Sequence, residues 1–375
     1  MILPGFRALC AILLAGVLLA ACASHDEPGP APSSSSSSAC GQEFLDGLNQ
    51  RERLAQLLMV GVKNADDAVD VITHEQVGGI FIGGWTDMSI FDRIKRIRQA
   101  ADHPVMVAID EEGGRVTRLG GDAMPSARRS AQTMTPAEVR EMARNRGKRM
   151  AKLGITVDFA PDVDVSAQAD DGPIGDRSYS DDPRVVTRYA RAFARGLHDA
   201  GILPVIKHFP GHGHAKGDSH TGLVTTPPLS KLVDRDLVPY KKLADLHPLG
   251  VMIGHLDVPG LTKDAQPASL SPRAVELLRT GYDGKWQPFD GPVFTDDLSG
   301  MQAITDNHGI DEAVTLALAA GADVALWLTT DEVPDVLDHL VSATKDGALE
   351  PDEINESVLR IARTKGILDC DPSTD

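Results

Sequence analysis

Short apolar segments recur along the chain, and a helical pattern of apolar residues follows each of them. Eight segments have the length and β-branched character of buried strands, and their regular spacing predicts an α/β fold, a (β/α)8 or TIM barrel, over residues 41–375. The predicted strands are Gln56–Val62, Val77–Gly83, Val105–Asp110, Thr156–Pro161, Ile202–Ile206, Gly250–Gly254, Pro292–Thr295 and Asp323–Leu328.

A doubly wound open sheet is the alternative architecture, but it would concentrate polar residues at a single switch point. Polar residues instead follow the third to the seventh predicted strand, as loops around one face of a barrel would place them. The predicted helices are Asp66–His74, Ser89–Ala101, Pro136–Leu153, Arg184–Ala200, Leu232–Leu246, Ser271–Thr280, Asp311–Ala320, Val333–Thr344 and Asp352–Ile367.

The first 21 residues have the organisation of a secretory signal peptide. A positive charge at Arg7 precedes a continuous apolar run, residues 8–21, which is too short to span a bilayer. The run ends in Leu19-Ala20-Ala21-Cys22, which resembles a bacterial lipobox, so we expect Cys22 to become a lipidated N-terminus. Ordinary cleavage followed by secretion is the alternative. The expected location is extracytoplasmic, with a lipid anchor in the cell membrane.

The segment 22–40 contains six consecutive serines together with proline, and cannot build a core. We expect it to be a flexible tether between the anchor and the folded domain. Cys40 and Cys370 lie at the two ends of that domain, and an extracytoplasmic compartment permits a disulfide between them. Two free thiols are equally compatible with the sequence, because the sequence does not give the distance between the two residues.

The formal net charge is −17, and no block of basic residues interrupts the acidic composition. A strongly acidic chain without a basic patch is not expected to bind nucleic acid. It is also not expected to dock on anionic lipid, so the lipid anchor would be the attachment to the membrane.

The densest group of titratable residues follows the fifth predicted strand, in the sequence KHFPGHGHAKGDSH of residues 207–220. Lys207 and His208 end the strand, and the loop after it carries Asp218 and His220. The end of a buried strand is where α/β proteins place chemistry. Residues i and i+2 of an extended chain lie on the same side, and a carboxylate favours the protonated form of a neighbouring imidazole. His220 is therefore a candidate proton donor, with Asp218 as its partner.

Two other predicted strands end in acidic residues. Asp110 ends the third strand and can accept hydrogen bonds from two sugar hydroxyls, while Arg118, eight residues later, can donate two parallel hydrogen bonds. The tandem glycines at 113–114 are expected to let the backbone pass close to a ligand. Asp296 ends the seventh strand, where a carboxylate can attack an anomeric carbon. The adjacent Asp297 points the other way in an extended strand and is expected to accept loop hydrogen bonds.

These segments together resemble glycoside hydrolase family 3, and in particular its single-barrel β-N-acetylglucosaminidases of the NagZ type. The resemblance extends from about residue 50 to residue 340. It implies a retaining β-N-acetylhexosaminidase that removes terminal β-1,4-linked N-acetylglucosamine, typically from peptidoglycan fragments, without a cofactor or a metal ion. The four motifs that carry it are Asp110–Val116, Lys207–Gly213, Asp218–His220 and Phe294–Ser299.

The resemblance also implies roles for single residues. Asp296 would be the nucleophile, and His220 with Asp218 would be the acid/base dyad. His214 and Lys216 have no family role. For Arg177, which lies in a Gly/Pro-rich loop after the fourth strand, an ordinary ion pair with Asp176 is the alternative. The residues expected to bind the sugar are Asp110, Arg118, Arg177, Lys207 and His208.

Four alternative functions remain open. The enzyme could act on β-glucosides or transfer the sugar to phosphate, since a histidine donor carries no negative charge to repel that anion. It could be a glycan-binding protein without turnover, against which the intact Asp296 and His220 argue. It could be a metal-dependent barrel hydrolase, although that would leave the motifs of Asp110 and Asp296 unexplained. The zinc ligands would then be His208, His212, His214, His220 and His255.

Overall fold

The computed structural model of the chain describes residues 36–218, 222–284 and 286–368. Eight parallel strands form one sheet in the order β10-β1-β2-β3-β4-β5-β7-β9. A parallel bridge between Phe294 in β9 and Val324, which directly precedes β10, joins the two ends of this order, so the sheet closes into a barrel. The predicted (β/α)8 barrel is confirmed. The strands are β1 (Leu58–Gly61), β2 (Gly79–Ile82), β3 (Met106–Ile109), β4 (Val157–Asp158), β5 (Leu203–Phe209), β7 (Gly250–Ile253), β9 (Val293–Thr295) and β10 (Ala325–Trp327).

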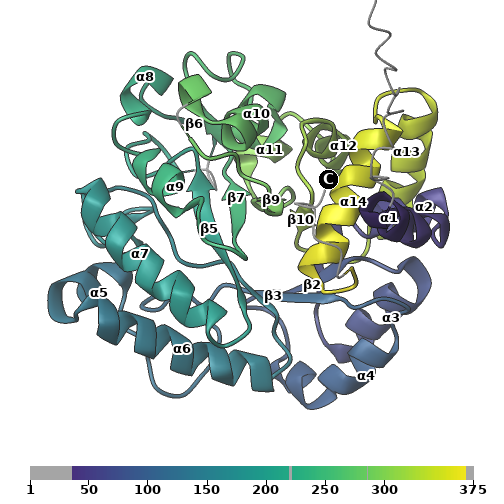
Figure 1. Cartoon of the computed structure of the whole chain (residues 1–375), viewed down its shortest axis with the longest axis horizontal. Helices are drawn as coiled ribbons and strands as arrows, with labels where there is room; N and C mark the ends of the chain where they lie inside the picture. Colours follow the sequence, from purple (N-terminus) through teal and green to yellow (C-terminus); the bar gives the residue numbers. More distant parts are fainter. Residues whose placement is uncertain (1–35, 219–221, 285, 369–375) are drawn as a thin grey trace, which may run out of the picture.

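Helices surround the barrel, with α6 and α7 side by side along one flank and α13 and α14 on the opposite flank (Figure 1). The strands are buried from both sides, which is why they appear in the sequence as continuous apolar runs and not as alternating ones. The longer helices are α3 (Ala65–Glu75), α6 (Pro136–Lys152), α7 (Pro183–His198), α10 (Pro272–Thr280), α12 (Ile310–Ala319), α13 (Val333–Lys345) and α14 (Pro351–Thr364). The shorter helices are α2 (Gln50–Ala55), α4 (Ile94–Gln99), α5 (Ala127–Thr133), α8 (Leu229–Leu232), α9 (Val238–Leu243) and α11 (Gln302–Thr305), with 3-10 turns η1 (Met88–Arg93), η2 (Gly175–Arg177), η3 (Ala268–Leu270) and η4 (Tyr282–Gly284).

Several predicted elements have different boundaries in the structure. The predicted helix Ser89–Ala101, for example, is the 3-10 turn η1 followed by the short helix α4. The first strand begins at Leu58 and not at Gln56, because α2, which a capping box between Asn49 and Glu52 starts, extends through Ala55. The predicted helix Leu232–Leu246 is wrong, since the chain forms the separate helices α8 and α9 there. Pro239 lies in the first turn of α9, where a missing N–H costs nothing, whereas the interior of a longer helix would lose a hydrogen bond.

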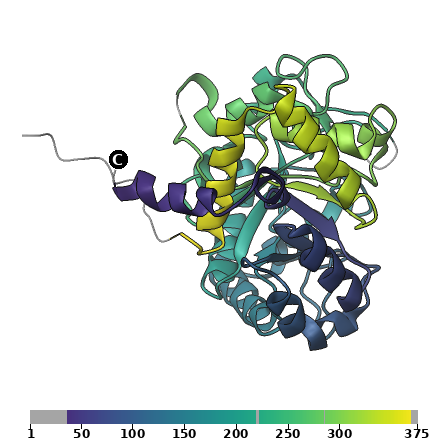
Figure 2. The same ribbon diagram turned by 90° about the vertical axis from the view of Figure 1, so that its right-hand side faces the viewer.

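Helix α1 (Ser36–Asp46) projects from the flank of the barrel beside α14 (Figure 2). It begins inside the segment that the sequence analysis assigns to the tether. The signal peptide, Cys22 and Cys370 lie outside the described residues, so the lipid anchor and the Cys40–Cys370 disulfide stay predictions. Within residues 36–368, apart from the two gaps, no helix has the length and apolar character needed to cross a membrane.

Candidate active site

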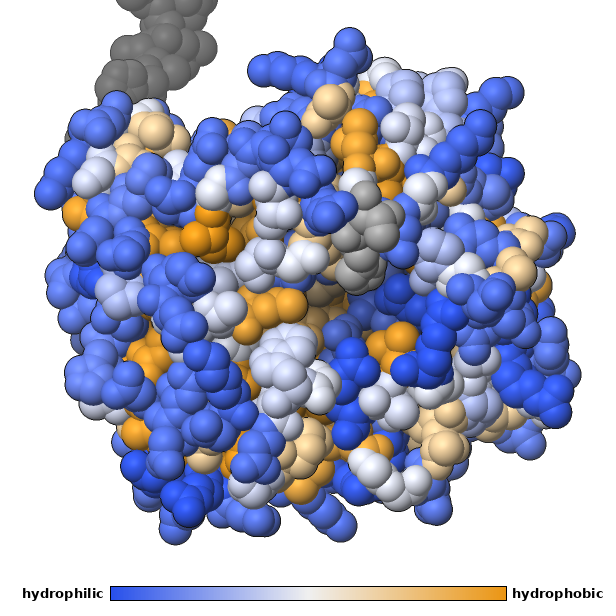
Figure 3. All heavy atoms as spheres, turned by 180° about the vertical axis from the view of Figure 1, so that it is seen from behind, coloured by the Kyte–Doolittle hydropathy of each residue, from blue (hydrophilic) through white to orange (hydrophobic). Residues whose placement is uncertain are grey.

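A cavity of about 330 Å³ opens at the carboxyl ends of the barrel strands. The face seen in Figure 3 is hollowed near its centre, where apolar side chains are interspersed with polar ones. His220 lies outside the described residues. The other sequence-predicted site residues all line this cavity: Asp110, Arg118, Arg177, Lys207, His208, Asp218 and Asp296.

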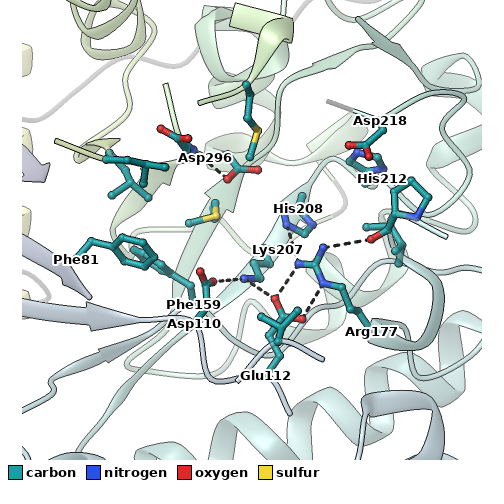
Figure 4. A pocket seen from close by; sticks show the side chains of 18 of the residues that line it. Phe81, Asp110, Glu112, Phe159, Arg177, Lys207, His208, His212, Asp218 and Asp296 are labelled. Carbon is teal, nitrogen blue, oxygen red and sulfur yellow. Dashed lines mark hydrogen bonds and ion pairs between the residues drawn. The ribbon is translucent and has the colours of Figure 1, made fainter. Parts of the chain in front are cut away.

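Lys207 forms the centre of a buried group of charges (Figure 4). Its ammonium nitrogen lies 2.6 Å from Asp110 Oδ1 and 2.6 Å from Glu112 Oε1. Burial alone would lower the pKa of Lys207, but the two carboxylates outweigh that effect and raise the pKa above its ordinary value. Lys207 is therefore a fixed cation at the end of β5.

Arg177 forms an ion pair with Glu112, the second of these two acids. Its Nε and Nη2 atoms donate to the two oxygens of Glu112 over 2.8 and 2.7 Å, in the parallel geometry that favours arginine–carboxylate pairs. Burial raises the pKa of Glu112, but Arg177 and Lys207 outweigh it and hold the pKa well below its usual range. The alternative partner considered for Arg177, Asp176, instead lies 3.5 Å from Arg115 Nε, and the ion pairs of Arg177 are with Glu112 and Asp162.

His208 connects Arg177 to a second buried acid. Its Nδ1 lies 2.8 Å from Asp164 Oδ2, and its Nε2 lies 3.3 Å from Arg177 Nη2. Because an arginine can only donate, Nε2 accepts a hydrogen bond from Arg177, and Nδ1 carries the ring proton and donates it in a hydrogen bond to Asp164. Burial and the charge of Arg177 lower the pKa of His208 to about 4, so the ring is neutral at physiological pH.

Asp162 and Asp164 lie side by side beneath His208 and are both buried. Asp164 accepts hydrogen bonds from His208 and from the backbone N–H of His212 at 2.6 Å. Burial and the neighbouring Asp164 raise the pKa of Asp162 to about 8, so Asp162 holds a proton at neutral pH. Glu112, Asp162 and Asp164 were not predicted as site residues, although Glu112 lies in the motif of Asp110 and the two aspartates directly follow the fourth predicted strand. His212 was considered only as a ligand of the metal alternative.

Asp296 follows β9 directly and is held there by a hydrogen bond from its N–H to Ile253 O of β7. Burial raises the pKa of Asp296, but its charged and hydrogen-bonding neighbours, among them the Asp297 N–H and Lys207, outweigh it, and the pKa lies below its ordinary value. Asp296 is therefore a carboxylate at neutral pH, next to the group of charges around Lys207.

The carboxylate of Asp297 is occupied by hydrogen bonds from the loop that follows it, in contrast to that of Asp296. The Asp297 carboxylate accepts hydrogen bonds from Ser299 N–H, Ser299 Oγ and Gly300 N–H, each over 2.8 Å. These contacts close the turn after β9 and fix the direction in which Asp296 leaves the strand. The two adjacent acids thus have the different surroundings that the strand geometry predicts.

The loop that carries Arg118 is fixed by Glu111, which lies between the acids Asp110 and Glu112 in the sequence. Glu111 is fully buried and accepts hydrogen bonds from the N–H groups of Arg118 and Leu119 and from the Arg146 guanidinium. The guanidinium of Arg118 lies 3.8 Å from Asp110 Oδ2. Glu111 therefore positions the loop, while its neighbour Asp110 faces the cavity.

Glycine is required at positions 113 and 114 for a different reason from the one expected from the sequence. Gly113 and Gly114 have φ values of 99° and 57°, which favour glycine. A Cβ atom on Gly113 would lie 2.6 Å from Pro125 O, and one on Gly114 would lie 2.6 Å from the side chain of Ser126. The glycines let the loop approach its own chain, and their predicted approach to a ligand is not what the structure requires.

The histidines of the metal alternative do not form a common cluster where the structure describes them. His255 donates through Nε2 to Asp297 O, so its Nδ1 accepts from Ser269 Oγ, while His214 Nδ1 pairs with Asp236 at 2.8 Å. Asp162, Asp164 and His208 do offer ligand atoms within 4.8 Å of one another. However, Arg177 Nε lies 3.7 Å from Asp162 and brings a positive charge to that group, which disfavours a cation there.

Asp218 and His212 lie on the side of the cavity opposite Phe81 (Figure 4). Asp218 is half-buried and belongs to the loop that leads to His220. An antiparallel bridge between Lys216 and Thr225 ties this loop to the small parallel sheet of β6 (Val224–Thr225) and β8 (Leu256–Asp257), which the sequence did not predict. Lys216 and His214 thus hold the described part of the loop beside the cavity, and the position of the predicted proton donor His220 stays a prediction.

Comparison with known proteins gives a consistent result. The model of the Glycosyl hydrolase family 3 N terminal domain matches residues 49–364. Beta-hexosaminidase LpqI of Mycobacterium tuberculosis is 57% identical over 85% of this chain and 83% of its own length, and a Beta-hexosaminidase of Xanthomonas oryzae pv. oryzae is 34% identical over 72% and 83%.

Solved structures agree with the sequence comparison. The structure of M. tuberculosis LpqI has a TM-score of 0.85 and covers 87% of this chain and 96% of its own. A glycoside hydrolase family 3 β-N-acetylglucosaminidase from Paenibacillus sp. is 31% identical, with a TM-score of 0.79 over 85% of this chain and 63% of that one. The chain belongs to glycoside hydrolase family 3, and it is a glycoside hydrolase of the β-hexosaminidase type.

Proposed function

We propose that the protein is a retaining exo-β-N-acetylglucosaminidase that releases terminal β-1,4-linked N-acetylglucosamine from peptidoglycan fragments. One observation carries the proposal: an ionised Asp296 at a strand end shares a cavity with a preformed set of charged groups around Lys207. The relatives named Beta-hexosaminidase and the Paenibacillus β-N-acetylglucosaminidase favour an N-acetylhexosamine as the sugar.

In the proposed reaction Asp296 attacks the anomeric carbon, and the bond from that carbon to the leaving oxygen breaks. His220 gives its proton to the leaving oxygen, and the sugar remains covalently bound to Asp296. Water then attacks the same carbon, His220 takes the proton of this water, and Asp296 is released. Two displacements at one carbon retain its configuration.

The proposed sugar-binding groups supply both kinds of hydrogen-bonding atoms. Asp110 accepts from hydroxyls, while Lys207, Arg177 and Arg118 donate to oxygens. His208 has both ring nitrogens engaged by protein groups, so it supports Arg177 as well as lining the cavity. These side chains are held by one another before a sugar arrives, which reduces the cost of ordering them on binding.

An assay with two aryl glycosides, each with and without phosphate, tests the proposed activity. We expect aryl β-N-acetylglucosaminide to be preferred over the aryl β-glucoside by roughly 10²-fold in kcat/KM, because the named relatives favour a sugar that carries the acetamido group. Phosphate should leave both the rate and the free-sugar product unchanged. Preference for the glucoside, or accumulation of a sugar 1-phosphate, would replace the proposal by one of the two alternatives within the family.

The location is proposed on the sequence alone, as a lipoprotein attached to the membrane through Cys22. Cys22→Ala should move the protein from the membrane fraction to the soluble extracytoplasmic fraction and remove the lipid mass from its N-terminus. Cys10→Ala is the matched control, since Cys10 would be removed with the signal peptide and its replacement should change neither. Membrane association that persists in Cys22→Ala, with an unaltered N-terminal mass, would refute the anchor.

A further inference from the structure

Trp85 is an exposed aromatic side chain that lines the same cavity. Its relative exposure is 48%, whereas Phe81, four residues earlier at the end of β2, is 4% exposed. The charged groups around Lys207 are buried, so Trp85 lies toward the open side of the cavity. A single exposed apolar residue is ordinary, and it is the support beneath Trp85 that distinguishes this one.

Four aromatic rings form a continuous series from the barrel interior to Trp85. The ring centroids of Phe294 and Phe159 are 5.5 Å apart, those of Phe159 and Phe81 are 5.7 Å apart, and those of Phe81 and Trp85 are 6.0 Å apart. These separations lie within the range in which aromatic rings attract one another. The indole of Trp85 thus rests on the buried core, and its exposed side is directed away from that support.

The backbone around Trp85 is fixed as well. Thr86 is buried, and its hydroxyl donates to Val62 O over 2.7 Å and accepts from the Gly83 N–H over 3.0 Å. A Cβ atom on Gly83 would lie 2.3 Å from the indole, so the ring packs directly on that glycine. These contacts hold the indole in one place, although the turn that carries it is on the surface.

We propose that Trp85 is the platform for the leaving group of the substrate, a second pyranose that stacks on the indole. This inference rests on the proposed function. The sugar that is transferred would occupy the buried end of the cavity, near Asp110, Lys207 and Asp296, so the remainder of the substrate must extend toward the open side, where Trp85 lies. One face of a pyranose presents C–H groups, which pack on an indole, while its hydroxyls remain in water.

Two substrates that differ only in their leaving groups test the platform. For a disaccharide with a terminal β-linked N-acetylglucosamine, Trp85→Ala should raise KM about tenfold and leave kcat within a factor of two, because the contact is equal in the ground state and the transition state. N-acetyl-β-glucosaminyl fluoride has a one-atom leaving group that does not reach Trp85, so its KM should not change. Trp85→Phe should restore part of the affinity for the disaccharide.

Met88→Ala is the matched control, since Met88 is an exposed apolar residue of the next turn, 38% exposed, that does not line the cavity. It should leave both substrates unaffected. Equal KM values for the disaccharide in the parent protein and in Trp85→Ala, or the same rise for the fluoride, would overturn the platform.

Tryptophan fluorescence gives a second measurement that does not require turnover. The chain has three tryptophans, and the other two, Trp286 and Trp327, are buried. In Asp296→Ala protein, the disaccharide should protect the emission from quenching by acrylamide, and N-acetylglucosamine alone should protect it less. Trp85→Phe should remove this protection. If the parent protein hydrolyses neither substrate, the proposed function fails, while protection by the disaccharide still decides whether Trp85 contacts a second sugar.

Discussion

Replacement of Asp296 by alanine should reduce hydrolysis by roughly 10⁴-fold or more on every substrate, activated or not. The reason is that no covalent intermediate can form once the carboxylate is removed, however good the leaving group is. Asp297→Asn is the comparison, because Asp297 accepts only loop hydrogen bonds from Ser299 and Gly300 and an amide keeps one acceptor oxygen. We expect that variant to lose activity much less. Equal losses in the two variants would contradict the assignment of the nucleophile.

Azide gives an independent measurement on the Asp296→Ala variant. The anion can enter the space of the missing carboxylate and displace an activated leaving group once, which inverts the anomeric carbon and yields the α-glycosyl azide. The pH profile supplies a further check. Because the pKa of Asp296 is lowered from 3.8, the nucleophile stays ionised throughout the weakly acidic range, and a loss of kcat/KM between about pH 4 and 6 must come from a different group.

Replacement of His220 by alanine should reduce the rate by an amount that depends on the leaving group of the substrate. A nitrophenolate is a good leaving group without protonation, whereas the alkoxide of a sugar must be protonated as it leaves. Hydrolysis of a disaccharide should therefore fall by about 10²–10⁴-fold, and cleavage of the aryl glycoside should fall much less. The second step loses its base, and the glycosyl-enzyme on Asp296 should accumulate with activated substrates. Mass spectrometry of the intact protein detects this species as an added sugar residue.

Azide should act differently on the His220→Ala variant. Here the anion attacks the covalent intermediate, so two displacements occur and the product is the β-glycosyl azide, the opposite anomer from that of Asp296→Ala. Asp218→Asn should resemble a milder His220 defect, because loss of the carboxylate lowers the pKa of the imidazole. Equal loss on disaccharide and aryl substrates, with no trapped intermediate, would remove His220 from the acid/base role.

The barrel was predictable because each strand is covered on both faces. Burial on both sides requires apolar residues at successive positions, and such runs are visible without knowledge of the tertiary structure. The boundaries were less accurate where a local signal competed with the apolar run. The capping box at Asn49 starts α2, whose C-cap is Gln56, the first residue of the predicted strand. Within the predicted helix Leu232–Leu246 the chain forms only the short helix α9, with Pro239 in its first turn, because α8 ends at Leu232.

The site was predictable as a set of residues but not as a set of contacts. Strand ends converge in any parallel barrel, so Asp110, Lys207 and Asp296 could be grouped from their places in the sequence. The partner of Arg177 could not be found in this way, because Glu112 lies 65 residues away and the adjacent Asp176 was an equally charged alternative. Long-range pairs of buried charges depend on geometry that local sequence does not contain.

The buried charges around Lys207 have a consequence for the conditions under which the protein can bind sugar. Two cations, Lys207 and Arg177, face two carboxylates, Asp110 and Glu112, within one group of contacts. A neutral sugar that enters this group neither takes up a proton nor releases a counterion, and buried pairs are little screened by salt. Sugar affinity would then stay constant as ionic strength and pH change, while the rate of bond cleavage would follow the protonation of the proposed acid/base dyad.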